Sequence, residues 1–248
     1  MVTSFVVLFA VSVWAGIQNA LAGGGTFLTL PALMLTGMTA LAANITSTVA
    51  LFPGQIASSL SGRAHVAGAG GLSFKALMVI SFAGGILGAI LLLVTPSSIF
   101  RHLVPWLVLF ATAVFAYGSF VPRKEDRPPV LGKIGAGLAQ FAISVYGGYF
   151  GGGIGFLMMA ALGAAGLAVR ESVANKNMLA VAMNASAVAI FLFSSQLHWM
   201  QAVIMILGSV GGGYAGGLMV NKVNQKALRL FVVLIGTALT VGLFLRAP

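Results

Sequence analysis

Two of the three runs of three glycines, those at residues 23–25 and 151–153, are the features of the sequence most able to do chemistry, and each lies in a long stretch without charged residues. Glycine inside a helix costs about 0.5–1 kcal/mol relative to alanine, so three in a row predict a break. A helix that begins directly after a break exposes N–H groups without intrahelical acceptors at the positive end of its dipole. Such ends bind anions. The two triplets therefore predict two backbone sites for a small anion.

The side chains close to the triplets are polar and, with one exception, uncharged. Their hydroxyl, amide and single ammonium groups can bind the oxygen atoms of sulfite, a sulfonate or a carboxylate. For each side chain the alternative is a helix cap or a hydrogen bond between helices. The predicted substrate-binding set is Gln18, Asn19, Gly23, Gly24, Gly25, Thr26, Asn44, Thr46, Ser47, Tyr146, Tyr149, Gly151, Gly152, Gly153, Asn175, Lys176 and Asn177, and Thr48 and Ser172 are neighbours of the same character.

The composition excludes a water-soluble domain. Of the 248 residues, 59% are hydrophobic and only 6% are charged, whereas about 25% is usual. Four stretches without any charged residue, at 1–62, 76–100, 134–169 and 177–221, each exceed the roughly 20 residues that a membrane-spanning helix needs. The basic residues occur singly or in small groups, which argues against nucleic-acid binding. The chain is therefore predicted to be an all-α polytopic membrane protein that has the lipid bilayer as its solvent.

Apolar runs between glycine, proline and charge predict ten helical segments. A polar segment, residues 122–132, divides them into a first membrane repeat at 1–121 and a second at 133–248. The predicted helices are 4–22, 26–36, 39–60, 76–95 and 102–121 in the first repeat, and 133–150, 154–168, 173–195, 200–220 and 229–246 in the second.

A shift of 128 positions places the first repeat on the second without a gap. Gly23–Gly25 then coincides with Gly151–Gly153, and Arg101 coincides with Arg229. Six glycines fall on glycines, whereas roughly one or two are expected by chance, which is typical of an internal repeat.

The basic residues then select a topology, because cytoplasmic loops carry an excess of lysine and arginine. If each triplet is the tip of a hairpin that returns to its own side, eleven of the thirteen cations share one side. A hairpin followed by three transmembrane helices is an odd number of crossings, so the two repeats are predicted to be inverted and the central linker cytoplasmic. The eleven cations are Arg63, Lys75, Arg123, Lys124, Arg127, Lys133, Arg170, Lys176, Lys222, Lys226 and Arg229.

The acidic residues argue against cation transport and catalysis. Glu125, Asp126 and Glu171 are the only carboxylates, and none lies within a predicted span. Side-chain carboxylates normally mark cation paths and acid relays. No span supplies a serine with a histidine or carboxylate partner, and cysteine is absent. The sequence therefore predicts a protein that is not an enzyme and has no metal site and no cofactor.

The stretch from Ala15 to Pro31, followed by Leu41 to Ser47, resembles the sulfite exporter TauE/SafE family, also called the toluenesulfonate uptake permeases (TSUP). The second copy, Tyr146 to Gly155, fits the same pattern, although Met159 stands where the first copy has Pro31. The resemblance covers nearly the whole chain. It implies a multi-pass carrier of the bacterial inner membrane for small anions, often organosulfur compounds such as sulfite and sulfonates.

Inverted repeats with interrupted helices are typical of secondary transporters. The predicted function is therefore export or uptake of small anions by alternating access. A passive anion channel and a non-transporting membrane scaffold are the alternatives. The sequence leaves open the exact substrate, the direction of transport, coupling to protons or sodium, and assembly into a homo-oligomer.

Overall fold

The computed structural model describes residues 2–21, 23–59, 65–120, 129–219 and 225–246. These residues form ten helices, and the only β-type pairing among them is an isolated bridge between Ala69 and Leu72. The prediction of an all-α protein is confirmed. The helices are α1 (Val2–Leu21), α2 (Thr26–Leu35), α3 (Ala40–Ser59), α4 (Phe74–Val94), α5 (Ser97–Phe120), α6 (Lys133–Tyr149), α7 (Ile154–Ala164), α8 (Val169–Phe191), α9 (Trp199–Met219) and α10 (Gln225–Arg246).

The helix breaks occur where the glycine triplets predict them. The first short helix begins at Thr26 and the second at Ile154, exactly as expected. The largest difference is at α5, which begins at Ser97 instead of residue 102. Helices α8 and α10 each begin four residues early, and α7 and α8 each end four residues early. Helix α5 starts directly after Pro96, and α8 starts where Glu171 Oε2 accepts a hydrogen bond from the amide of Ala168. Arg101 and Arg170 therefore lie inside helices, although their charge suggested loops.

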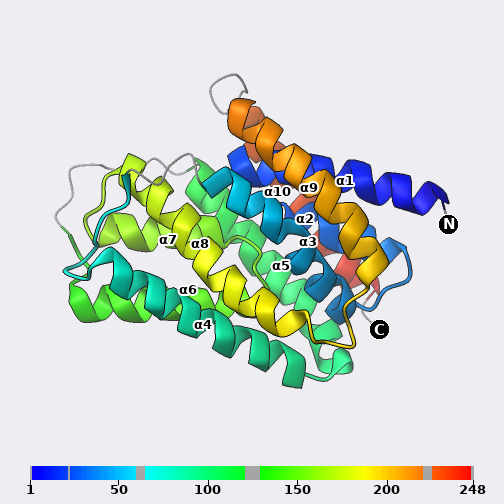
Figure 1. Cartoon of the computed structure of the whole chain (residues 1–248), viewed down its shortest axis with the longest axis horizontal. Coiled ribbons are helices and arrows are strands. Elements are labelled where there is room, and N and C mark those ends of the chain that lie inside the picture. Colours follow the sequence, from blue (N-terminus) through cyan, green and yellow to red (C-terminus); the bar gives the residue numbers. More distant parts are fainter. Residues whose placement is uncertain (1, 22, 60–64, 121–128, 220–224, 247–248) are drawn as a thin grey trace.

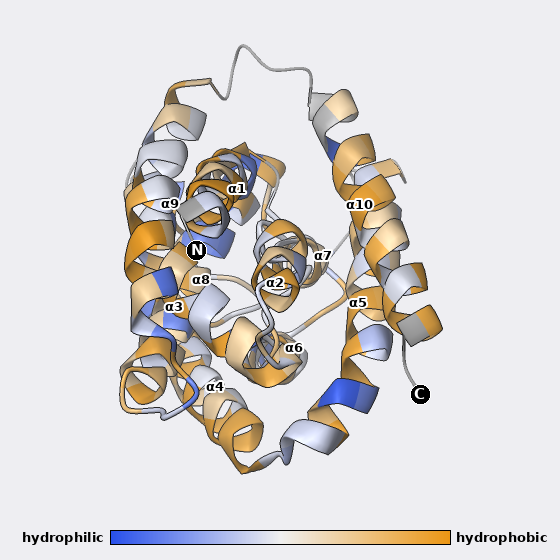
Figure 2. Ribbon diagram, turned by 90° about the vertical axis from the view of Figure 1, so that its right-hand side faces the viewer, coloured by the Kyte–Doolittle hydropathy of each residue, from blue (hydrophilic) through white to orange (hydrophobic). Residues whose placement is uncertain are grey.

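Four helices are long and apolar enough to span a membrane, namely Thr3–Leu21 of α1, α4, α5 and α9. Helices α2, α7 and residues Arg229–Leu245 of α10 are apolar but shorter. Figure 2 shows mostly hydrophobic residues along α4, α5 and α10, whose exposed side chains include Phe82, Phe110 and Leu234. Apolar outer surfaces of this kind are expected where lipid replaces water.

The helices form two groups that exchange one member. Helices α1, α2, α3 and α9 pack together, and α6, α7, α8 and α4 pack together. Figure 1 places the second group at the left end of the molecule and the first at the right. Each group thus contains three helices of one half of the sequence and the fourth helix of the other half. Helices α5 and α10 pack against each other, and α3 contacts α8.

Hydrogen bonds give the directions of the central helices. The amides of Val130 and Leu131, just before α6, donate to the carbonyl of Ala164 at the end of α7. The chain from α6 to α7 is therefore a hairpin that returns to its starting end. The start of α3 lies beside the segment after α8, because the His198 amide donates to Thr46 Oγ1. The segment after α3 lies beside the start of α8.

The segment after α3 contacts the start of α8 through Ala67 and Asn175. Asn175 Oδ1 accepts a hydrogen bond of 2.9 Å from the Ala67 amide, and Asn175 Nδ2 donates one of 2.7 Å to the Ala67 carbonyl. Helices α3 and α8, which occupy the same position in the two halves, therefore run in opposite directions. The predicted linker at residues 122–132 lies mostly outside the described residues. The same holds for Arg63, Arg123, Lys124, Arg127 and Lys222.

Candidate functional site

Both glycine triplets leave helical geometry. In the first, Gly23 and Gly24 have φ angles of +79° and +84°. In the second, Gly151 and Gly153 have φ angles of +81° and +73°. A residue with a Cβ atom is strained in this left-handed region, so glycine is what allows the chain to turn here within the apolar protein.

Two amide side chains of α1 hold the first break in place. Gln18 is 1% exposed, and its Nε2 donates to the carbonyl of Gly24 at 3.2 Å. Asn19 Oδ1 accepts a hydrogen bond of 2.7 Å from the amide of Gly25, directly before α2. The amide of Gly25 is therefore bonded to Asn19 and does not face a ligand unpaired.

A single cavity lies where the two breaks meet, with a volume of about 70 Å³. One water needs roughly 10–15 Å³ by this kind of measure, so the space suits several waters or one small oxyanion. Its walls come from both breaks and from the facing helices α3 and α8. The lining residues are Asn19, Gly23, Gly24, Thr26, Thr48, Leu51, Phe52, Gln55, Ser58, Gly151, Gly153, Ile154, Gly155, Lys176, Asn177, Ala180 and Asn184.

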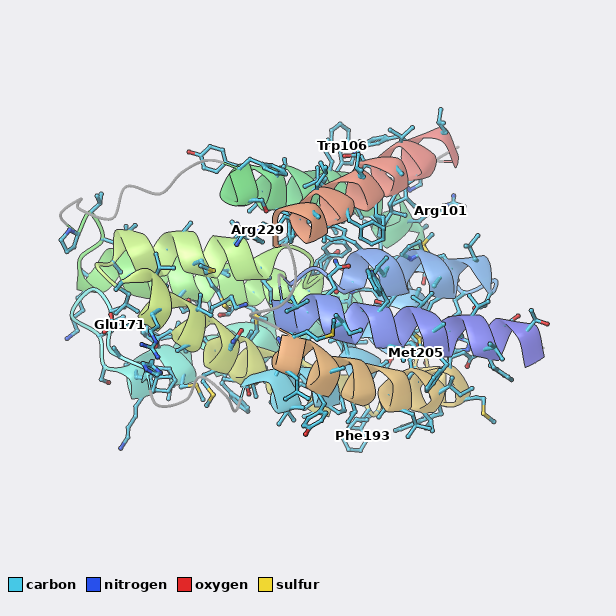
Figure 3. The ribbon with its side chains drawn as sticks, turned by 90° about the horizontal axis from the view of Figure 1, so that it is seen from above. Arg101, Trp106, Glu171, Phe193, Met205 and Arg229 are labelled. Atoms are coloured by element: carbon cyan, nitrogen blue, oxygen red, sulfur yellow. The ribbon has the colours of Figure 1, made fainter. Side chains whose placement is uncertain are left out.

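Among the residues that the structure describes, Lys176 is the only charged side chain that lines this cavity. A Cβ atom built on Gly155 would lie 3.3 Å from Lys176 Cδ and 3.9 Å from its Nζ, so the ammonium lies over the first turn of α7. Glu171 is the only carboxylate side chain in the part of the chain that the structure describes, and it does not line the cavity. Figure 3 shows Glu171 at the opposite end of the molecule from Arg101.

The two sides of the cavity differ in charge. Thr48, the counterpart of Lys176 under the shift of 128, also lines the cavity, and its hydroxyl donates to the carbonyl of Asn44. Neither α7, which begins after Gly153, nor α2, which begins after Gly25, has a side-chain cap, although Asn19 accepts a hydrogen bond from the amide of Gly25. An ammonium and a helix N-terminus both favour negative charge, so the α7 side of the cavity is the more favourable one for an anion.

Eight of the predicted site residues line the cavity: Asn19, Gly23, Gly24, Thr26, Gly151, Gly153, Lys176 and Asn177. The others support the surrounding structure. Asn44 Nδ2 donates to the carbonyl of Tyr149 at the second break, which ties the two halves together. Ser47 Oγ lies 2.6 Å from Thr29 Oγ1 between α3 and α2.

Further predicted residues also act in packing. Tyr149 donates from its hydroxyl to Thr95 Oγ1, and the ring of Tyr146 packs edge-on against Phe110. The remaining ones are Gln18, Gly25, Thr46, Gly152 and Asn175, none of which lines the cavity.

The prediction omitted three polar residues of the cavity wall, Gln55, Ser58 and Asn184. Asn184 Nδ2 of α8 donates to Gln55 Oε1 of α3 at 2.7 Å, which joins the two halves at the cavity wall. The sequence does not single them out, because α3 and α8 contain several other polar residues. Gln55 and Asn184 lie two to three helical turns beyond the predicted residues of α3 and α8. They meet only because these two helices run in opposite directions.

Comparison with known proteins gives consistent matches over almost the whole chain. Residues 8–243 match the sequence profile of the family described as Sulfite exporter TauE/SafE. A probable membrane transporter protein of Haemophilus influenzae is 29% identical over 239 residues, which cover 94% of this chain and 92% of that protein. The probable membrane transporter protein YfcA of Escherichia coli K12 is 26% identical over 240 residues, which cover 96% and 88%. Both glycine breaks lie inside the matched regions.

Proposed function

The chain belongs to the sulfite exporter TauE/SafE family of membrane proteins, and we propose that it is a secondary transporter of small anions that binds its substrate in the cavity between the two glycine breaks. The observation that carries this proposal is the position of Lys176, whose ammonium lies over the uncapped N-terminus of α7 inside that cavity. Sulfite and organic sulfonates are the proposed substrates, because the family description names sulfite and their oxygens suit these donors.

We further propose that the two halves are inverted repeats that give alternating access to the cavity. Support comes from α3 and α8, which run in opposite directions and meet at the bond between Gln55 and Asn184. The exchange of α4 and α9 between the two helix groups gives further support, because most helix contacts of one half have a counterpart in the other; the contact of α3 with α5 is the exception. Transporters of this design bind substrate between their repeats and rock one against the other.

We also propose the membrane in which the protein lies and its orientation there. We place the protein in the bacterial inner membrane with its central linker in the cytoplasm, where the positive-inside rule puts most of the basic residues. The binding set for substrate is the group of cavity-lining residues, with Gly25, Gln18 and Gly152 holding the breaks.

Flux measurements in proteoliposomes test the proposal. Labelled sulfite, short sulfonates and carboxylates should enter with saturable kinetics, and an unlabelled anion inside the vesicles should accelerate entry of the labelled one. A channel gives flux without saturation or counterflow. A scaffold gives no flux, and either of these results would contradict the proposed mechanism.

Two substitutions of Asn19 separate its structural role from its place beside the substrate. Asn19→Ala removes the acceptor for the Gly25 amide, so the free energy of unfolding should fall by about 1 kcal/mol, as for loss of an N-cap. Asn19→Asp keeps the acceptor but places a carboxylate in the cavity, and like charges repel. We expect Asn19→Asp to melt at or above the temperature of Asn19→Ala, yet to transport anions more slowly. Equal flux in both variants would place the substrate away from this residue.

A further inference from the structure

A second cavity, of about 340 Å³, lies between α2, α5 and α10 and differs from the first in size and chemistry. Its volume is within the range of small-molecule pockets, about 300–1,000 Å³. Apart from Arg101, its lining consists of apolar side chains and one glycine. The lining residues that matter for the argument are Met34, Leu35, Arg101, Leu239, Gly242 and Leu243.

This cavity opens toward the side of the molecule that faces lipid. Leu35 at its edge is 77% exposed, and Arg101 is also exposed. Helices α5 and α10, which form its other walls, carry exposed apolar side chains such as Leu109 and Val241. An apolar groove beside such surfaces is filled by hydrocarbon in a bilayer, because lipid chains are as apolar as leucine.

Arg101 adds a charge to this groove. It lies one turn into α5, near the positive end of the helix dipole, where a cation gains no stability from its own helix. Glu171, the carboxylate that the structure describes, is at the other end of the molecule in Figure 3. A guanidinium at this position is suited to bind phosphate oxygens in pairs.

We propose that this groove is a binding site for one anionic phospholipid, with an acyl chain between α2, α5 and α10 and the headgroup phosphate on Arg101. An anionic headgroup is favoured over a zwitterionic one because the latter carries an ammonium that Arg101 repels. The site is separate from the cavity between the glycine breaks and does not depend on the proposed transport activity.

Native mass spectrometry of the purified full-length protein tests this site, with phosphatidylglycerol and phosphatidylcholine of the same acyl chains added in equal amounts. We expect phosphatidylglycerol to be retained roughly fivefold more than phosphatidylcholine, the preference that one arginine near a membrane surface gives. Arg101→Gln should bring the ratio close to one. Lys75→Gln removes an exposed cation outside the groove and should leave the ratio unchanged.

A second variant tests the acyl-chain groove itself. A Cβ atom on Gly242 would meet nothing within 4 Å, so Gly242→Leu can fill the groove without displacing the backbone. This variant should retain less of both lipids. Gly217→Leu is its control, because Gly217 has equally open space on α9 outside the groove.

Three results would overturn the proposal: an unchanged lipid ratio in Arg101→Gln, unchanged lipid retention in Gly242→Leu, or displacement of phosphatidylglycerol by millimolar inorganic phosphate. The last would assign Arg101 to a free anion and leave the apolar groove without a role.

Discussion

Lys176→Met is expected to lower the transport efficiency for sulfite or a sulfonate by roughly 10- to 150-fold. A hydrogen bond to a charged group contributes about 1.5–3 kcal/mol, and each 1.4 kcal/mol is a factor of ten in affinity. Methionine keeps the length and the apolar stem that packs near Gly155. The cavity should therefore keep its shape and lose the charge of Lys176.

Initial rates of labelled anion uptake into proteoliposomes, measured over a range of concentrations, check this effect. Lys176→Arg retains the charge and should keep much of the activity. Lys75→Gln changes an exposed cation that does not line the cavity and should leave the rate unchanged. If Lys176→Met transports at the wild-type rate, the anion does not bind at the start of α7.

Gly212→Leu is expected to lower the yield of folded protein strongly, whereas Gly211→Leu, at the preceding position of α9, is expected to fold normally. A Cβ atom on Gly212 would overlap the backbone of Val13 in α1, and only separation of the two helices could relieve this contact. On Gly211 the same atom would meet nothing within 4 Å. Both changes improve helix propensity by a similar amount, so the difference isolates the helix packing.

The yield of monodisperse protein after detergent extraction measures this difference. Overpacking a rigid contact costs about 1–3 kcal/mol and sometimes more, against a total stability of only about 5–15 kcal/mol. Neighbouring glycines make the same kind of contact, since Gly208 faces Phe9 and Gly216 faces Ile17. Equal yields of the two variants would mean that α1 and α9 do not pack along this face.

The helices and their breaks could be predicted because they follow from local chemistry. The glycine triplets at 23–25 and 151–153 break the chain, and both short helices begin at the expected residues, whereas the triplet at 211–213 stays inside α9. The spacing of Gly208, Gly212 and Gly216 likewise predicts a close helix contact, which α1 provides.

The pairing of helices could not be predicted in this way. The sequence gives no local signal that α4 packs with α6 and α8, or that α9 packs with α1 and α3. Such exchange depends on tertiary contacts between distant segments. The division into repeats at 1–121 and 133–248 therefore does not coincide with the two packed helix groups.

Part of the candidate site could be predicted from local sequence, and the rest depends on tertiary contacts. The triplet residues Gly24 and Gly153 line the cavity, and so does Lys176 of α8. Polarity alone could not separate them from Ser47 and Asn175, which bond to Thr29 and Ala67. A polar side chain within lipid must find a partner, and only the fold decides whether that partner is protein or ligand.

The most direct test of an anion site between the two breaks is anomalous diffraction from crystals soaked in selenite, an analogue of sulfite with a heavier central atom. The proposed site predicts one strong selenium peak within the cavity, beside Lys176 Nζ and the first amides of α7, and the peak should be lost in Lys176→Met crystals. A selenium peak outside this cavity, in protein that still transports sulfite, would contradict the proposed site.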